Sequence, residues 1–374
     1  MTRPPDRFVP LNKPDLGDAE EKSVVEALRS GWVTTGSRVR DLESEFAAMI
    51  GRTHALAVSS GTTALEAALI GVRVGPGDGV LTQGYVCDAV ANAVHRVTHR
   101  APVVVDIEPE TWSLDAEHVK VAVMSRPPLR AVILAHTYGT PARDLIEIAD
   151  ICRLHRVPLI EDCSEAHGAS LDGRPVGSFG DVAIWSLRGE KTVSGGQLGI
   201  VLSDDAAVMR RAKRYVFNGL PSDAVRFWSS VPGVNGQPSN LNAALACAQL
   251  ARLDELRSAR NRINAGWRQR LFQHVDFQGW RGDPCWWLTA IILDRFTRLL
   301  PQDFAGALRE RGIESRTAFY GLHLLPHCQG SEMLPCPVTE GLMTSLLILP
   351  SGPGITEDDQ DYVCEQMFEI VGRR

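Results

Sequence analysis

Leu159-Ile-Glu-Asp162-Cys-Ser-Glu165 and Val182-Ala-Ile-Trp-Ser186-Leu-Arg-Gly-Glu-Lys191 are two runs that begin apolar and end polar. The first run delivers the carboxylate of Asp162, and the second delivers the hydroxyl of Ser186 and the amine of Lys191. Ligands of an open α/β sheet bind beyond the carboxyl ends of its strands. The two runs therefore predict strands that place Asp162 and Lys191 beside one crevice.

A carboxylate and an amine at such a crevice suit pyridoxal phosphate. Lysine forms the Schiff base with this cofactor, and an aspartate keeps the pyridinium nitrogen protonated so that the ring can accept electrons. The chain has only five lysines, at positions 13, 22, 120, 191 and 213, among many arginines. Arginine cannot form an imine at neutral pH, which makes Lys191 informative. The alternatives are that Asp162 caps a turn at its strand end and that Lys191 is a surface lysine.

Composition sets the broad class of the protein. With 374 residues the chain should hold about two domains, and its 44% hydrophobic and 22% charged residues are usual for a soluble globular protein. A net charge of −6 without basic runs argues against nucleic-acid binding. We find neither an apolar leader segment nor an apolar stretch long enough to span a bilayer, so we expect no membrane role and a cytoplasmic location. The eight cysteines form no C-x-x-C pair, which predicts reduced thiols and no zinc site.

Short apolar runs alternate with helical patterns in the first part of the chain. The runs near residues 79–82, 103–106, 131–136 and 158–162 are apolar on both faces, as in a parallel sheet covered on both sides. Earlier, an apolar run meets Ser60-Gly61-Thr62 and turns directly into a helical pattern. The N-terminus of that helix predicts an anion site, because its N–H groups are free and Gly61 lets a phosphate approach the backbone. The alternative is an ordinary strand–turn–helix joint with a Ser/Thr cap.

The second part of the chain predicts a different arrangement. One long helix is expected from about Asn240 to Val275, and helices of this length usually connect domains or cross an interface. The rest reads as a smaller α+β unit. We therefore expect a large α/β domain over residues 1–240 and a smaller C-terminal domain over residues 241–374, which includes the long connecting helix.

The ordered motifs of the chain resemble those of the DegT/StrS group of pyridoxal-phosphate nucleotide-sugar aminotransferases. The resemblance covers nearly the whole length, and its most specific segments include Ser30-Gly-Trp-Val-Thr-Thr-Gly, Ser60-Gly-Thr-Thr-Ala-Leu, His136-Thr-Tyr-Gly, Ile160-Glu-Asp, Ala166-His-Gly-Ala and Val176-Gly-Ser-Phe-Gly-Asp. It implies the aspartate-aminotransferase-type fold (fold type I), with a mostly parallel sheet in the large domain. It also implies pyridoxal 5'-phosphate as the cofactor and a homodimer with shared active sites.

The resemblance also assigns roles to individual residues. It implies that Lys191 is the Schiff-base lysine, Asp162 the pyridinium partner and Glu165 a neighbour of the ring hydroxyl. The residues matching the phosphate cradle are Gly61, Thr62 and Ser186, joined by Asn235 from the partner subunit. The residues expected near the substrate are His323, Gln237 and Thr35, the last in a polar turn that could instead merely join two helices.

Three positions depart from the family pattern. Cys87 stands where an aromatic ring commonly stacks on the cofactor, although a cysteine can still pack there as a small hydrophobe. Gln197 and Leu198 replace the usual Glu-Gly, and Gln237 replaces a common arginine, which removes a fixed cation that could pair with a substrate carboxylate or phosphate. His323 and His327 have no Glu or Cys partner at zinc spacing, so we expect no metal.

These features predict a pyridoxal-phosphate-dependent aminotransferase. The amino group would pass from an amino acid, glutamate or glutamine by family analogy, to a keto sugar that is nucleotide-linked. Two alternatives stay open at this point. One is a sugar dehydratase with the same cofactor, although similar dehydratases carry His at the position of Lys191. The other is a catalytically reduced regulatory or partner subunit, which the three departures suggest.

Overall fold

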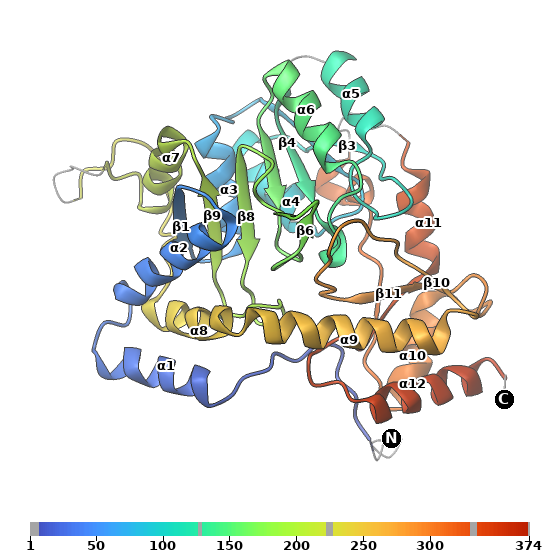
Figure 1. The fold of residues 1–374 in the computed structure, drawn as a ribbon. Coiled ribbons are helices and arrows are strands. Elements are labelled where there is room, and N and C mark those ends of the chain that lie inside the picture. Colours follow the sequence, from blue (N-terminus) through green and yellow to red (C-terminus); the bar gives the residue numbers. More distant parts are fainter. Residues whose placement is uncertain (1–6, 126–128, 222–226, 330–334, 373–374) are drawn as a thin grey trace.

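The computed structural model describes residues 7–125, 129–221, 227–329 and 335–372. Within these residues the central element is a seven-stranded sheet with the strand order β1-β9-β8-β5-β4-β2-β3 (Figure 1). Its strands are β1 (His54–Val58), β2 (Gly79–Gln83), β3 (Val103–Val105), β4 (Leu129–Ala135), β5 (Leu159–Asp162), β8 (Val182–Ser186) and β9 (Gly199–Ser203). Only β9 runs against the other six strands of this sheet, so the prediction of a mostly parallel sheet is confirmed.

Helices cover both faces of this sheet, because its strands are apolar on both sides. Val58 of β1 packs with helices α3, α4 and α7, whereas the adjacent Ala57 packs with α2 and α8. Helices α5 and α6 extend this second layer over β2, β4 and β5. The helices are α1 (Asp18–Arg29), α2 (Ser37–Ile50), α3 (Gly61–Gly71), α4 (Ala89–Thr98), α5 (Ala116–Ser125), α6 (Leu145–His155), α7 (Ala206–Val216) and α8 (Asn240–Ala251). None of the helices in the described residues is both long and apolar enough to cross a membrane.

A second, four-stranded sheet follows in the C-terminal part of the chain. It is antiparallel throughout, with the order β10-β11-β13-β12. Its elements are β10 (Asp276–Phe277), β11 (Thr289–Ile292), α10 (Pro301–Glu310), β12 (Arg316–Thr317), α11 (Pro337–Ser345), β13 (Leu346–Leu349) and α12 (Glu357–Ile370). The short connections are the hairpin β6 (Ser170–Leu171) and β7 (Arg174–Pro175) and the 3-10 turns η1 (Thr137–Gly139), η2 (Leu322–Leu324) and η3 (Pro326–Cys328).

The predicted long helix is instead two consecutive helices. Helix α8 ends at Ala251, and α9 (Leu253–Leu271) begins after Arg252, whose backbone leaves the helical range at φ −102° and ψ 11°. The Arg252 side chain donates to Asp15, Glu20 and Glu255, so the break coincides with an ion-paired cluster. In Figure 1 the two helices run end to end from below the large sheet toward the small one. The division into domains after residue 240 stays a prediction.

The two sheets are joined beside the carboxyl end of β4. Backbone N–H groups of Cys285 and Trp287 donate to the carbonyls of Gly139 and Tyr138, at 2.9 and 3.0 Å. Gly139 has φ +98°, and a Cβ atom there would clash with the carbonyl oxygen of Cys285. This position therefore requires glycine for both its backbone conformation and its close packing.

We predict that Gly139→Ala lowers the free energy of unfolding by about 3–5 kcal/mol, because left-handed strain and overpacking add. Gly173→Ala is the matched control, because Gly173 also has a positive φ, +75°, but nothing lies within 4 Å of its Cβ position. The control should lose only about 1–2 kcal/mol. Urea unfolding followed by circular dichroism measures both, and equal losses would contradict the packing contribution.

Candidate active site

A cavity of about 280 Å³ lies at the carboxyl ends of β5 and β8 and the N-terminus of α3. Of the residues predicted to bind the cofactor, those that line it are Gly61, Thr62, Cys87, Asp162, Glu165, Ser186 and Lys191. Gln197, one of the three departures from the family pattern, lines it as well. Strand ends that were predicted to face one crevice therefore do so.

The N-terminus of α3 forms one end of this cavity. Ser60 caps the helix by accepting the Thr63 N–H at 3.1 Å, and the preceding N–H groups at the helix start have no intrahelical acceptor. Gly61 lies so close to β8 that an added Cβ would be 2.7 Å from the Cβ of Ser186. Helix N–H groups, the Ser186 hydroxyl and an open backbone together can hold a phosphate.

Asp162, the last residue of β5, lies buried in the cavity. Its Oδ1 accepts the Ser164 N–H at 3.0 Å. Burial raises the pKa of this carboxyl, and the hydrogen bonds from Ser164 and the charge of Lys191 only partly oppose the effect. A cation placed beside Asp162 would favour its charged form, and a protonated pyridine nitrogen is such a cation.

The Lys191 amine is held between a carboxylate and an aromatic ring. Its Nζ lies 3.4 Å from Oε1 of Glu165 and 3.3 Å from the ring centre of Trp287. Burial raises the pKa of Glu165, while Lys191 and the Tyr138 N–H, which donates to Oε2 at 2.8 Å, lower it. The amine is thus fixed on an inner wall of the cavity with its side chain only 9% exposed.

Trp287 is a site residue that the sequence did not reveal. The Trp280, Trp286 and Trp287 cluster looks like core and interface filling in the sequence, and no local motif marks Trp287 as different. In the structure its Nε1 donates to the carbonyl of Glu190 at 2.7 Å, and its ring contacts the neighbouring Lys191. Arg316 and Phe319 also line the cavity and were likewise not predicted.

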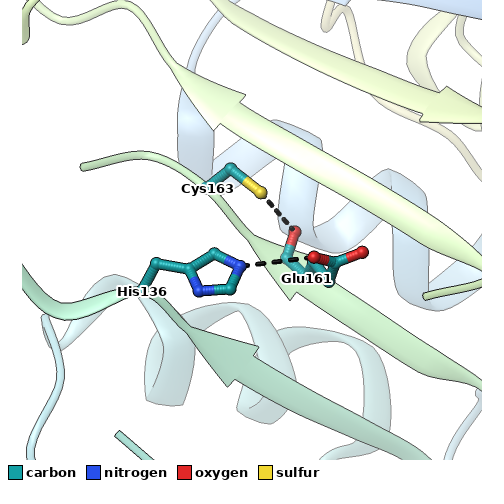
Figure 2. A group of neighbouring side chains, drawn as sticks. All are labelled: His136, Glu161 and Cys163. Atoms are coloured by element: carbon teal, nitrogen blue, oxygen red, sulfur yellow. Dashed lines mark hydrogen bonds and ion pairs between the residues drawn. The ribbon is translucent and has the colours of Figure 1, made fainter. Parts of the chain in front are cut away.

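A buried group beside the cavity joins His136, which also lines the cavity, with Glu161 and Cys163 (Figure 2). Figure 2 shows the His136 ring pointing toward the Glu161 carboxylate, with Nε2 and Oε2 3.3 Å apart. The Ala142 N–H donates to Nδ1 of His136, which makes Nε2 the protonated nitrogen. The Glu161 oxygens also accept the N–H groups of residues 177, 179 and 180. These bonds satisfy the potential ligand atoms of His136 and Glu161 without an ion, so the group is best described as a scaffold for the end of β5.

His167 is buried differently. Both of its ring nitrogens are buried, and the backbone of Ser186 offers the ring a hydrogen bond that only weakly opposes the effect of burial. Burial, together with the nearby cations Lys191 and Arg260, lowers the pKa of His167 to about 3. The imidazole is therefore neutral in the folded protein at ordinary pH.

Four predicted residues do not line this cavity. Thr35 and Gln237 line a separate hollow of about 580 Å³ with Lys213. Asn235 forms an isolated bridge with Phe217. His323 lies on η2, where its Nε2 is 3.1 Å from Oε1 of Glu340.

The residues present in the cavity fit pyridoxal phosphate. The cradle at Gly61 and Ser186 suits its phosphate, and the buried carboxylate of Asp162 suits its ring nitrogen. The amine of Lys191 suits its aldehyde carbon. This is the cofactor that the sequence predicts.

Comparisons with known proteins agree with this geometry. The model of the DegT/DnrJ/EryC1/StrS aminotransferase family matches residues 14–368. A GDP-perosamine synthase from Vibrio cholerae is 32% identical over 96% of this chain and 97% of its own length. A GDP-perosamine synthase from Escherichia coli O157:H7 is 28% identical over 97% of this chain and 99% of its own length.

The crystal structure of DesI in the presence of its TDP-sugar product superimposes with a TM-score of 0.89 and 27% identity. The superposition covers 98% of this chain and 94% of the DesI chain. The predicted fold, that of the fold type I pyridoxal-phosphate aminotransferases, is confirmed by such neighbours.

We predict that His167 makes the protein sensitive to moderate acid. The folded pKa of about 3 lies below the ordinary 6.5, so the folded state binds fewer protons than the unfolded state. Its contribution to stability is complete above pH 6.5 and is lost as the pH falls toward 3. Between pH 7.5 and 5 this amounts to about 2 kcal/mol.

Urea unfolding at a series of pH values tests this contribution. In His167→Gln the acid-dependent loss should shrink by about 2 kcal/mol, whatever the stability of the variant at neutral pH. His155→Gln is the control, because His155 is exposed at the end of α6. An unchanged pH slope in His167→Gln would show that His167 is not the responsible group.

Proposed function

This chain belongs to the DegT/DnrJ/EryC1/StrS aminotransferase family and is a pyridoxal-phosphate-dependent nucleotide-sugar aminotransferase, and we propose that it aminates a GDP-linked keto sugar. Family membership confirms the resemblance seen in the sequence. The GDP moiety is supported by the names of two relatives that span nearly the whole chain. We propose glutamate or glutamine as the amino donor, by the family analogy drawn from the sequence.

One observation carries the proposal: Lys191, Asp162 and the N-terminus of α3 line a single cavity. When bound, pyridoxal phosphate supplies the electron sink and carries the amino group between the two substrates. We assign Asp162 to the ring nitrogen, and we assign Gly61, Thr62 and Ser186 to the phosphate. The Lys191 amine would take the proton from the α-carbon of the donor and deliver it to C4′ of the cofactor, and in the second half of the reaction it would carry a proton from C4′ to the sugar carbon that is aminated.

Two features of the site separate this function from its alternatives. The dehydratases similar to this family carry His where this chain has Lys191, and a histidine has no primary amine to form an imine. A regulatory subunit would not need a buried amine between Glu165 and Trp287. Cys87 keeps a place in the cavity, where burial raises the pKa of its thiol to about 11 and so keeps it neutral and apolar.

We also propose a homodimer whose sites are shared between subunits. Thr35, Asn235, Gln237 and His323 do not line the Lys191 cavity of their own chain, so any role in a site fits the neighbouring subunit best. Exposed Trp32 and Trp228 flank this region of the chain and would be buried by such a contact. We propose a cytoplasmic location, which the eight free thiols support.

The direct test supplies pyridoxal phosphate, L-glutamate and GDP-4-keto-6-deoxymannose. We predict that the wild type forms a GDP-linked amino sugar, detected by mass spectrometry, and that Lys191→Ala loses at least about 1,000-fold in rate because its base and imine-forming amine are gone. Borohydride reduction should attach the cofactor to Lys191, as found by peptide mapping. Lys120→Ala, an exposed change on α5, is the control. A dehydrated product without nitrogen, or a label on another lysine, would contradict the assignment.

The shared site is tested by mixing two defective proteins. Asn235→Asp places a carboxylate against the cofactor phosphate and should damage the site more than Asn235→Ala. If Asn235 serves the partner's site, a hybrid with Lys191→Ala has one intact site, and random exchange should restore about a quarter of wild-type activity. Native mass spectrometry verifies exchange. No recovery after verified exchange would leave Asn235 serving its own chain or no site at all.

A further inference from the structure

Arg316 lies at the wall of the active-site cavity, and part of its guanidinium is left unsatisfied by the described residues. It begins β12, at the edge of the small sheet, and lines the same cavity as Lys191 and Asp162. Its Nε and Nη2 atoms are buried, and neither has a hydrogen-bond partner among the described residues. Buried guanidinium nitrogens normally find acceptors, because an unsatisfied charged donor costs more than a neutral one. The position therefore needs an acceptor that the described residues do not provide.

Two of the carboxylates that line the cavity, Glu165 and Asp162, are otherwise engaged. Glu165 acts electrostatically on Arg316, but its Oε1 lies 3.4 Å from Lys191 and its Oε2 accepts the Tyr138 N–H. Asp162 accepts the Ser164 N–H and is the carboxylate that we assign to the cofactor ring. A carboxylate on a bound ligand would satisfy these two nitrogens.

The surroundings of Arg316 fix it beside the reacting amine. Its guanidinium carbon lies 5.7 Å from the ring centre of Trp287 and 5.6 Å from that of Phe319. Aromatic faces hold a guanidinium but offer no strong acceptor for its N–H groups. The same Trp287 ring contacts the Lys191 amine at 3.3 Å. The indole of Trp287 therefore lies beside both the guanidinium of Arg316 and the lysine amine where the donor reacts.

We propose that Arg316 binds the α-carboxylate of the amino-acid donor. The proposal rests on the aminotransferase function and deepens it by giving the donor a binding residue. An amino acid carries its amine and its carboxylate on one carbon, so a donor that reacts beside Lys191 brings a carboxylate close to that amine. The planar guanidinium can accept it through two parallel hydrogen bonds.

The experiment compares donors that differ in one carboxylate. The donor half-reaction is followed by cofactor absorbance with L-glutamate, L-glutamine and L-isoglutamine, in which the α-carboxylate is an amide. Wild type should prefer the first two donors. Arg316→Gln should lower kcat/KM for both by about 10- to 100-fold and leave isoglutamine nearly unchanged, because only a charge-assisted pair is lost. The kcat/KM of Arg316→Lys should lie between those of the wild type and Arg316→Gln, since lysine keeps the charge but cannot form two parallel hydrogen bonds. Arg309→Gln, an exposed change on α10, is the matched control.

Binding provides a readout that is independent of turnover. Glutarate, a dicarboxylate without an amine, is titrated calorimetrically into protein loaded with pyridoxal phosphate. Its Kd should rise about 10-fold or more in Arg316→Gln, whereas the Kd for GDP should stay unchanged. A weaker GDP complex with unchanged glutarate binding would assign Arg316 to the nucleotide phosphates and overturn the proposal.

The other outcomes are equally distinct. If Arg316→Gln lowers kcat/KM by the same factor for all three donors, Arg316 has only a structural role. If kcat/KM falls far more for glutamate than for glutamine, Arg316 binds the side-chain carboxylate instead. Either result, or unchanged selectivity, overturns the proposal while the wild-type reaction upholds the aminotransferase function. Failure of every donor with the wild type, with cofactor bound, would overturn both.

Discussion

The carbonyl oxygen of Glu190 is the point on which the site depends. It accepts hydrogen bonds from Asn12 at 2.7 Å, from Trp287 at 2.7 Å and from the guanidinium of Arg260 at 3.4 Å. Arg260 is 1% exposed and also donates to the carbonyls of Trp287 and Ser351 and to the side chain of Asn12. Burial lowers the pKa of Arg260 to about 10, so it still carries its charge at neutral pH. One buried cation therefore ties the N-terminal segment, the Lys191 loop and the small sheet together.

The contacts of the Glu190 carbonyl help to hold the connection that carries Lys191. Lys191 lies between β8 and β9 in a connection without regular secondary structure, where its N–H donates to the carbonyl of Arg188 at 2.8 Å. Side chains that are distant in the sequence fix this connection further, and Trp287 contributes both a donor to the Glu190 carbonyl and a surface for the Lys191 amine. Truncating Arg260 would remove the guanidinium donor from the carbonyls of Trp287 and Ser351, which costs more than the loss of one exposed bond. The position of the β8–β9 connection therefore depends on the packing of the small sheet on the large one.

The same coupling explains which parts of the site could be predicted from the sequence. Asp162, Ser186 and Gly61 were predictable because each stands at the end of a strand or the start of a helix, where local pattern fixes position. Trp287 and Arg316 were not, because they come from the C-terminal part of the chain and enter the cavity only through tertiary packing. The break at Arg252 was missed for a related reason: it coincides with ion pairs to Asp15, Glu20 and Glu255, and two of these acids are far away in the sequence. Hydrophobic periodicity reports burial and does not register such polar interruptions.

The two sheets contribute opposite charges to the cavity. The large sheet contributes a carboxylate, Asp162, whose pKa is raised by burial, an effect that the nearby Lys191 only partly offsets. The small sheet contributes the guanidinium of Arg316, two of whose nitrogens have no hydrogen-bond partner among the described residues. Between them Lys191 and Glu165 already pair with each other. Among the described residues, the carboxylate of Asp162 from the large sheet and the guanidinium of Arg316 from the small sheet are therefore only partly compensated. A cofactor that offers a ring cation would compensate Asp162, and a donor carboxylate at Arg316, as we propose, would compensate the guanidinium.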